Sequence, residues 1–99
     1  MDETASLTLR YTPTARHDIA RILGYIGDQS PQARKTIEAE LLNVFDLLRN
    51  FPLAGTATTR AGLRRRVVAP FPYVVFYQVN GSRLVIVAVR HTARRPRFR

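Results

Sequence analysis

The side chains best suited to chemistry in this chain are basic, and most of them lie in its second half. His91 stands between Arg90 and the pair Arg94 and Arg95. Arginine stays protonated in proteins, so these residues can bind a phosphate or stabilise a developing negative charge, but they cannot act as ordinary bases. His91 could accept a proton at neutral pH, because the neighbouring arginine charges favour its neutral form. His91 is therefore the candidate catalytic residue if the chain cleaves RNA.

A second basic run, Arg64-Arg65-Arg66, and the tyrosines Tyr73 and Tyr77 complete the candidates. Cleavage of RNA without a metal needs a base together with cationic groups that stabilise the transition state, and this half of the chain offers both types. A metal centre is not expected, because hard cations need oxygen ligands and no Asp or Glu follows Asp46. The chain also lacks cysteine, which excludes a thiolate metal site and disulfides. We expect no cofactor.

Charge is divided unevenly along the sequence. The net formal charge is +9, with −2 from residues 1–46 and +11 from residues 47–99, where there are eleven arginines. A surface of one sign attracts anionic partners such as phosphate backbones or an acidic protein segment, whereas a surface that only confers solubility usually mixes both signs. For the arginine run, the alternative is a charged sheet edge that discourages pairing with other strands. The predicted target-binding surface consists of Arg64, Arg65, Arg66, Arg90, His91, Arg94 and Arg95.

The length of 99 residues predicts one domain with one core, covering residues 1–99. We expect the basic tail 94–99 to be disordered until a partner binds it. The N-terminus is acidic and lacks the basic and apolar blocks of a signal peptide, and no apolar run is long enough to span a membrane. The expectation is therefore a cytoplasmic protein without membrane contact.

The first half of the chain predicts a strand followed by two helices. Residues 6–11 alternate apolar and polar side chains, which is the period of a half-buried strand. Thr12-Pro13 and Ser30-Pro31 are typical helix starts, with the hydroxyl as N-cap and proline in the first turn. We expect helices over 13–27 and 31–50, folded into an antiparallel hairpin because about three residues join them. The apolar stripes are Ala15, Ile19, Ile22 and Ile26, then Ile37, Leu41, Val44 and Leu48 broadened by Leu42 and Phe45, while Arg16, His17, Asp18 and Arg21 lie off the first stripe.

The second half predicts a loop over 53–62, a strand within 63–69, and a hairpin of two β-rich runs. Asn80-Gly81 supplies the two residues with positive φ that a type I′ turn requires. With this turn, the register pairs Tyr77 with Leu84 and, on the other face, Phe76 with Val85.

Both faces of this hairpin are apolar, which is typical of central strands covered on two sides, yet the chain offers only one helical layer. If the helices cover one face, the other keeps an apolar patch rimmed by arginine, and such patches often mark partner sites. The alternative is that the C-terminal tail or a second copy of the chain covers it. The candidate partner-binding residues on this face are Val74, Phe76, Val85, Val87 and Arg90.

The order of elements and four local motifs resemble the ParE branch of the ParE/RelE toxin superfamily. The motifs are Tyr-Thr-Pro-x-Ala at residues 11–15, Asn50-Phe51-Pro52, Phe71-Pro72-Tyr73 at the start of the third strand, and His91-x-x-Arg94. The predicted fold is α+β, with an N-terminal strand, an antiparallel helix hairpin and a three-stranded antiparallel segment, forming one sheet packed on the helices.

The resemblance implies the toxin of a type II toxin–antitoxin system, in a hetero-oligomer with an acidic antitoxin on the apolar face described above. The ParE branch is associated with poisoning DNA gyrase, and the RelE branch with cleaving messenger RNA on the ribosome. This chain has Val74 where the ribonucleases usually have arginine, and Phe98 near the place of a catalytic tyrosine, whereas His91 lies where some ribonucleases keep a catalytic histidine. ParE-type toxins often carry arginine at the position of Val74 too, so a weakened or retargeted toxin stays open.

The leading hypothesis is therefore a toxin that binds and poisons DNA gyrase. The alternative is a ribosome-dependent, metal-independent endoribonuclease that uses His91 and arginines. A second alternative is a basic nucleic-acid-binding module without toxicity.

Overall fold

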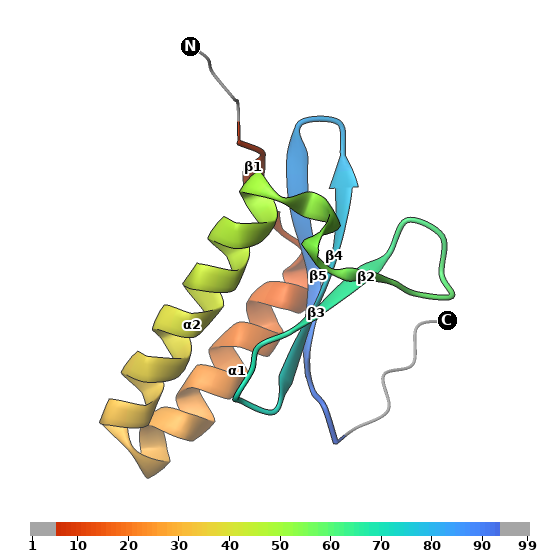
Figure 1. Cartoon of the computed structure of the whole chain (residues 1–99). Helices are drawn as coiled ribbons and strands as arrows, with labels where there is room; N and C mark the ends of the chain where they lie inside the picture. Colours follow the sequence, from red (N-terminus) through yellow and green to blue (C-terminus); the bar gives the residue numbers. More distant parts are fainter. Residues whose placement is uncertain (1–5, 94–99) are drawn as a thin grey trace.

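Two helices lie against a five-stranded sheet in an α+β fold (Figure 1). The structure is a computed structural model and describes residues 6–93. The strand order is β1-β5-β4-β3-β2, in which β1 pairs parallel with β5 and the other neighbours are antiparallel. The predicted fold class is confirmed. The elements are β1 (Thr8–Tyr11), α1 (Pro13–Gln29), α2 (Pro31–Asn50), a 3₁₀ turn η1 (Pro52–Ala54), β2 (Thr56–Ala57), β3 (Arg64–Val67), β4 (Tyr73–Asn80) and β5 (Arg83–His91).

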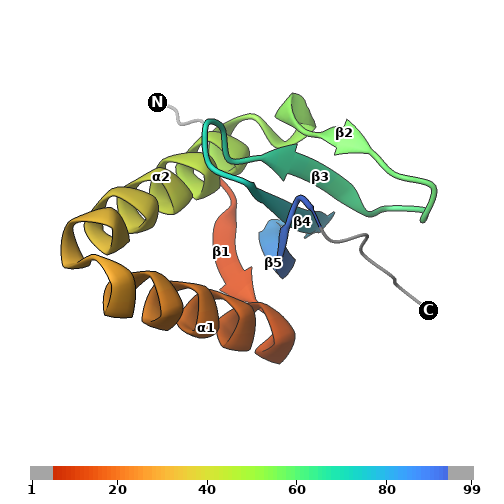
Figure 2. The same ribbon diagram turned by 90° about the horizontal axis from the view of Figure 1, so that it is seen from below.

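A single residue, Ser30, joins the two helices, where the sequence predicted about three. Its backbone N–H donates to the Ile26 carbonyl at 2.8 Å and so ends α1, which continues two residues beyond the predicted end at Gly27. Its Oγ accepts from the Ala33 N–H at 3.1 Å and so begins α2. Because one residue caps both helices, α1 with its backbone N–H and α2 with its side chain, the connection is shorter than separate caps would need. Figure 2 shows the helices joined at this end and spread apart at the other.

The core lies between the helices and one face of the sheet. Both predicted stripes contribute to it, together with Leu23 on α1 and Val75, Tyr77, Leu84, Ile86 and Val89 on the sheet. Two side chains differ from the prediction. Leu42 is 55% exposed, whereas Asp18, expected among the polar residues off the stripe, is buried with 2% of its surface exposed. His17 is exposed, as predicted.

The hairpin of β4 and β5 has a different register from the predicted one. Asn80 pairs with Arg83, so the two loop residues are Gly81 and Ser82 rather than Asn80 and Gly81. Gly81 has φ of 60°, and no residue other than glycine has positive φ in residues 6–93. A type I′ turn at Asn80-Gly81 would need positive φ at Asn80, whereas glycine alone at the first loop position matches a type II′ turn. Tyr77 therefore pairs with Ile86 instead of Leu84.

A β-bulge in the same hairpin changes which residues share a face. The pairing moves from Tyr77 with Ile86 to Phe76 with Ala88, which leaves Val87 as the extra residue of β5. After the bulge Val75 pairs with Val89, and both belong to the core under the helices. The bulge therefore places Ala88 on the opposite face, in a cluster with Phe76.

The segment 53–62 was predicted to be a loop, but its first part is ordered structure. η1 follows α2 directly, and β2 pairs with β3 at the edge of the sheet, Thr56 opposite Arg65 and Ala57 opposite Arg64. Two residues make a strand too short to show a periodicity in the sequence. The side chains of β3 and β4 hold η1 and β2 in place.

Candidate functional site

The arginines of β3 point to both faces of the sheet, as the alternation of a strand requires. Arg64 and Arg66 share the face of their partners Tyr77 and Val75, toward the helices, and Arg65 shares that of Phe76. Arg64 Nη2 donates to the Gly55 carbonyl at 2.7 Å, and Arg66 Nη1 donates to the Ala54 carbonyl at 2.9 Å. Two of the three predicted target-binding arginines of β3 therefore hold the η1 turn.

The Tyr77 hydroxyl fixes the same turn from inside the fold. It accepts a hydrogen bond from the Gly55 N–H at 3.0 Å and donates one to the Pro52 carbonyl at 2.6 Å. A side chain at position 55 would collide with this hydroxyl and would lie 2.6 Å from the Arg65 carbonyl. Tyr77 is thus a structural residue and leaves the set of proton-transfer candidates.

Asp18 connects α1 with the open edge of β5. Beyond the part of β5 that pairs with β1, the Val89 N–H donates to Asp18 Oδ2 at 3.0 Å, where a further strand would otherwise accept it. Arg90 Nη1 donates to both carboxylate oxygens, at 2.9 and 3.0 Å, and Arg21 lies 3.7 Å from the same carboxylate. The predicted target-binding residue Arg90 is therefore engaged by a buried carboxylate inside the protein.

His91 lies at the end of β5 and makes two contacts. Its ring stands edge-on to the Tyr73 ring, with 5.5 Å between centroids and 82° between planes. Its Nδ1 accepts a hydrogen bond from the Ala93 N–H at 3.1 Å. Nδ1 must then carry the lone pair, so the neutral ring carries its proton on Nε2. In this arrangement Nε2 donates a hydrogen bond and does not accept a proton.

Tyr25, near the end of α1, lies close to Tyr73. Burial raises the pKa of the Tyr73 phenol above the ordinary value of 10.0, and the nearby Tyr25 adds to the rise. Tyr25 itself is 65% exposed. The Tyr73 and His91 rings therefore meet where the sheet ends, and the Tyr25 phenol lies near enough to Tyr73 to affect its pKa.

The sheet face away from the helices does not leave all of its predicted partner-binding residues open. Val74 and Phe76 are 3% and 4% exposed, in a cluster with Leu63 and Ala88. Val85 and Val87 are half-buried. The open apolar patch expected on this face is therefore not present at Val74 and Phe76.

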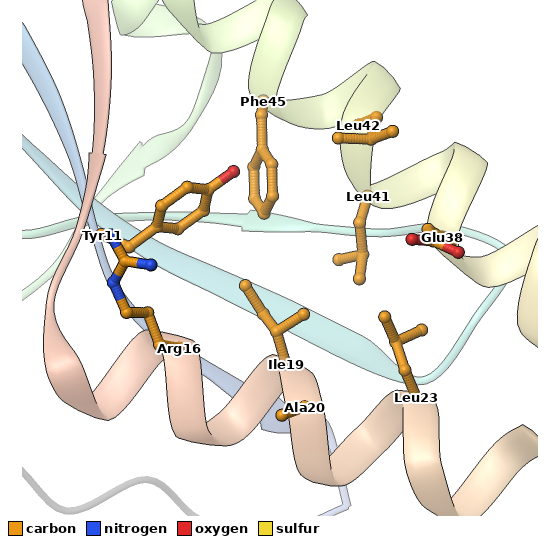
Figure 3. A pocket seen from close by; sticks show the side chains of 9 residues that line it. All are labelled: Tyr11, Arg16, Ile19, Ala20, Leu23, Glu38, Leu41, Leu42 and Phe45. Atoms are coloured by element: carbon orange, nitrogen blue, oxygen red, sulfur yellow. The ribbon is translucent and has the colours of Figure 1, made fainter.

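A hollow of about 330 Å³ opens between the two helices (Figure 3). Apolar side chains of α1 and α2 line it, among them Ile19 and Phe45, with Arg16 and Glu38 as its charged members. The Tyr11 ring lies edge-on to Phe45 at 5.8 Å, and the Arg16 guanidinium stands 5.6 Å from the centre of the Tyr11 ring. Burial raises the pKa of Tyr11, and the charge of Arg16 opposes the rise.

The predicted target-binding residues do not form one cluster. Arg64 and Arg66 bind η1, Arg65 is exposed on the far face, and Arg90 with His91 lies at the end of β5. Arg94, Arg95 and the predicted disordered tail 94–99 lie outside the described residues. Within residues 6–93 no group of His, Asp and Glu could hold a metal ion, and no helix is long and apolar enough to cross a membrane.

Sequence reasoning missed Asp18 and Tyr25, although a signal for Asp18 was present. Asp18 follows Ala15 by three residues and precedes Ile22 by four, which are the spacings of the buried stripe itself. An acidic residue at such a position needs a buried donor, and Arg90 was available. Tyr25 carries no comparable signal, since its place beside Tyr73 depends on how α1 crosses the sheet.

Similarity to known toxins extends over most of the chain. The sequence model for the ParE toxin of the type II toxin–antitoxin system parDE matches residues 9–96. The chain belongs to the ParE toxin family. Toxin RelE2 of Caulobacter vibrioides is 39% identical to it over 84 residues, covering 85% of this chain and 93% of that protein.

Solved structures share the fold of this ParE-family toxin. The chromosomal ParDE system of P. aeruginosa has a chain with a TM-score of 0.76 and 16% identity, covering 89% of this toxin and 98% of that chain. The RelBE2 toxin–antitoxin complex of Mycobacterium tuberculosis has a chain with a TM-score of 0.62 and 22% identity, covering 95% of this toxin and 100% of that chain. Both likenesses concern the fold alone.

Proposed function

We propose that this toxin inhibits growth by binding DNA gyrase in the cytoplasm, without chemistry of its own. The observation that carries the proposal is the hydrogen bond from the Ala93 N–H to His91 Nδ1. It leaves Nε2 as a donor, so the one histidine of the basic half is not oriented as a general base. The match to the ParE family model is in keeping with gyrase as the target, whereas the name of the relative Toxin RelE2 is in keeping with the ribosome.

The test is a supercoiling assay with gyrase and the purified, antitoxin-free toxin, scored for lost supercoiling and for trapped, cleaved DNA. We expect both. Arg65→Gln combined with Arg94→Gln and Arg95→Gln should weaken the inhibition, because these arginines would contact the target. Arg90 is left unchanged, because its loss would deprive the buried Asp18 of its closest ion-pair partner. Undiminished supercoiling with a folded sample would refute the proposal.

The second candidate is a ribosome-dependent endoribonuclease, favoured by one observation: His91 and Tyr73 lie in ring contact at the end of the sheet. Rotation of the His91 ring on binding RNA would free a nitrogen to accept a proton. This candidate predicts that His91→Ala abolishes cleavage of messenger RNA on translating ribosomes, whereas His17→Ala, an exposed histidine on α1, does not. Full toxicity of His91→Ala would remove it.

We further propose an acidic antitoxin as the physiological partner, in a hetero-oligomer. The solved structures with this fold include toxin–antitoxin complexes, and the sheet half of this chain is strongly basic. The contacts we propose are Val85 and Val87, with Val74, Phe76 and Arg90 supporting them. Val87→Asp should weaken the complex in a titration by calorimetry, and an unchanged affinity would place the antitoxin elsewhere.

A further inference from the structure

The hollow between α1 and α2 is an open and mainly apolar surface of the helical layer (Figure 3). Leu23, Leu41 and Phe45 are buried and form its floor. Leu42 also lines it and is 55% exposed. An apolar centre of this kind with a charged rim is the usual composition of a protein–protein contact.

Arg16 and Glu38 are the charged residues of the hollow, and they lie at its opposite ends (Figure 3). The Arg16 guanidinium stands 5.6 Å from the centre of the Tyr11 ring, and that ring lies edge-on to Phe45 at 5.8 Å. Glu38 precedes Phe45 by seven residues on α2, which is about 10 Å along the helix axis. The hollow therefore has one positive and one negative end with apolar side chains between them.

Both charged side chains can meet the charge of a partner. Each is exposed, and neither forms an ion pair with another residue of the described range 6–93. The Tyr11 ring holds the Arg16 guanidinium by a cation–π contact. Arg16 therefore loses less conformational freedom when a carboxylate binds it than an unsupported arginine would.

A surface with opposite charges at its two ends is complementary to a second copy of itself. In a two-fold dimer the same surface of both copies meets, so every contact between two different residues occurs twice. A two-fold axis through the centre of the hollow places Arg16 of one copy opposite Glu38 of the second copy, at both ends. The apolar side chains between these ends then meet across the axis.

The distribution of charge favours the helical layer over the sheet for such a contact. α1 carries two arginines and two aspartates, and α2 carries three basic and three acidic side chains, so each helix has a formal charge of zero. Residues 51–93 carry arginines and no acidic side chain. Two sheets would therefore repel each other, whereas two helical layers would not. An acidic partner, by contrast, is attracted to the sheet half of the chain.

We propose that the antitoxin-free toxin forms a two-fold dimer through the hollow between α1 and α2, with ion pairs between Arg16 and Glu38 on both sides of an apolar centre. The dimer uses the helical layer, opposite the sheet face on which we place the antitoxin. The proposal goes beyond inhibition of gyrase and does not depend on it.

The experiment is sedimentation equilibrium of the antitoxin-free toxin over a range of protein concentrations, for which we expect a monomer–dimer equilibrium. Leu42→Asp should abolish the dimer, because it places a carboxylate of each copy in the apolar centre. Leu53→Asp is the matched control, since it makes the same change at an exposed leucine of η1, and it should leave the dissociation constant unchanged. Circular dichroism shows beforehand that each variant is folded.

Charge reversal tests the orientation of the two copies. Arg16→Glu and Glu38→Arg, each alone, should raise the dissociation constant about tenfold or more, because like charges then face each other at both ends. The double variant Arg16→Glu/Glu38→Arg should regain the dimer. An equimolar mixture of the two single variants should regain it too, because opposite charges then face each other between unlike chains. Arg83→Glu, the same change at an exposed arginine of β5, is the control and should not weaken the dimer.

Three results would overturn the proposal. The first is a folded toxin that stays monomeric at every concentration, which would leave the hollow to a different protein such as the antitoxin. The second is a dimer that withstands Leu42→Asp and both single charge reversals, which would place the contact on another surface. The third is a double variant and a mixture that are folded but monomeric, which would show that Arg16 and Glu38 do not face each other. Gyrase inhibition is measured separately in the supercoiling assay, so a failure there would remove only the function proposed above.

Discussion

Asp18 is a buried carboxylate whose three hydrogen bonds come from one backbone N–H and one guanidinium nitrogen. Removing one partner of such a group lowers the free energy of unfolding, because it leaves an uncompensated polar group in the interior. Arg90 therefore serves the fold, although its charge and its place in the sequence suggested a contact with the target. The same holds for Arg64 and Arg66, whose guanidinium groups bind backbone carbonyls.

Asp18→Ala should lower the free energy of unfolding by about 3–5 kcal/mol, because Arg90 loses its buried partner and the Val89 N–H loses its acceptor. Asp18→Asn should cost less, since the amide oxygen can still accept from Val89. Urea unfolding measures both. Asp28→Ala, at an exposed position of the same helix, is the control and should change stability by less than about 0.5 kcal/mol. Equal effects at positions 18 and 28 would contradict this role.

The half-buried phenols of Tyr11 and Tyr73 predict a loss of stability at high pH. Burial raises the pKa of Tyr11 and of Tyr73 in the folded state above 10.0, so the folded chain holds these protons more tightly than the unfolded chain. Their contribution is complete below about pH 10 and is lost as the pH rises through the folded-state pKa. Above about pH 9, the melting temperature should therefore fall less steeply with rising pH in the double variant Tyr11→Phe/Tyr73→Phe than in the unchanged toxin. Identical slopes in the double variant and the unchanged toxin would rule out the explanation.

At the scale of the elements, η1 and β2 depend on side chains from the two strands beside them. Tyr77, Arg64 and Arg66 donate to the carbonyls of Pro52, Gly55 and Ala54. η1 and β2 join α2 to the rest of the sheet, and β2 pairs with β3 through only two residue pairs. Its position is thus determined by contacts distant in sequence.

Gly55→Ala should destabilise the toxin by about 1–3 kcal/mol, because the added methyl group meets the Tyr77 hydroxyl and the Arg65 carbonyl. Gly24→Ala is the matched control, since a methyl group there meets no atom within 4 Å. That change should be neutral or stabilising, because alanine favours the helix. The two variants are compared by their midpoints in urea. A Gly55→Ala variant as stable as Gly24→Ala would show that the turn can shift to accommodate the methyl group without a loss of stability.

The helices and the long strands could be predicted from the sequence because their signals are local. Thr12-Pro13 and Ser30-Pro31 mark both helix starts, and the two stripes point to the core as expected. The register of β4 and β5 could not be predicted in this way. Asn80-Gly81 and Gly81-Ser82 are both acceptable turns, and packing of the strands decides between them.

The candidate site was predicted less well than the fold, for a related reason. Arginines can be counted in a sequence, but whether each one is free depends on tertiary contacts. Arg64, Arg66 and Arg90 are engaged by groups 9 to 72 residues away in the chain. The sequence likewise conceals the effect of Tyr25 on Tyr73, because the two residues lie far apart in the chain.

At the scale of the whole molecule, the helices carry both signs of charge, whereas the strands and turns after them carry only positive charge. Every carboxylate side chain of residues 6–93 lies on α1 or α2, and the strands and turns after Asn50 carry arginine without any acidic residue. Asp18 and Asp46 reach arginines of the second half, Arg90 and Arg49. The remaining arginine charges of the sheet repel one another in the isolated toxin.

The midpoint of thermal unfolding should therefore rise when salt is raised from low to moderate concentration, because counter-ions screen this repulsion. Arg65→Gln with Arg83→Gln removes two exposed charges and should reduce the dependence on salt. Calorimetry over a series of sodium chloride concentrations measures both. A midpoint independent of salt would show that repulsion within the sheet is already neutralised.

The parallel pairing of β1 with β5 has a consequence for synthesis of the chain. Leu9 and Tyr11 are translated well before the strand that pairs with them, Arg83–His91. Until then β1 has no neighbour in the sheet, and contacts so distant in sequence form late and at a high cost in entropy. The sheet of a nascent copy is therefore completed only after β5 has been translated.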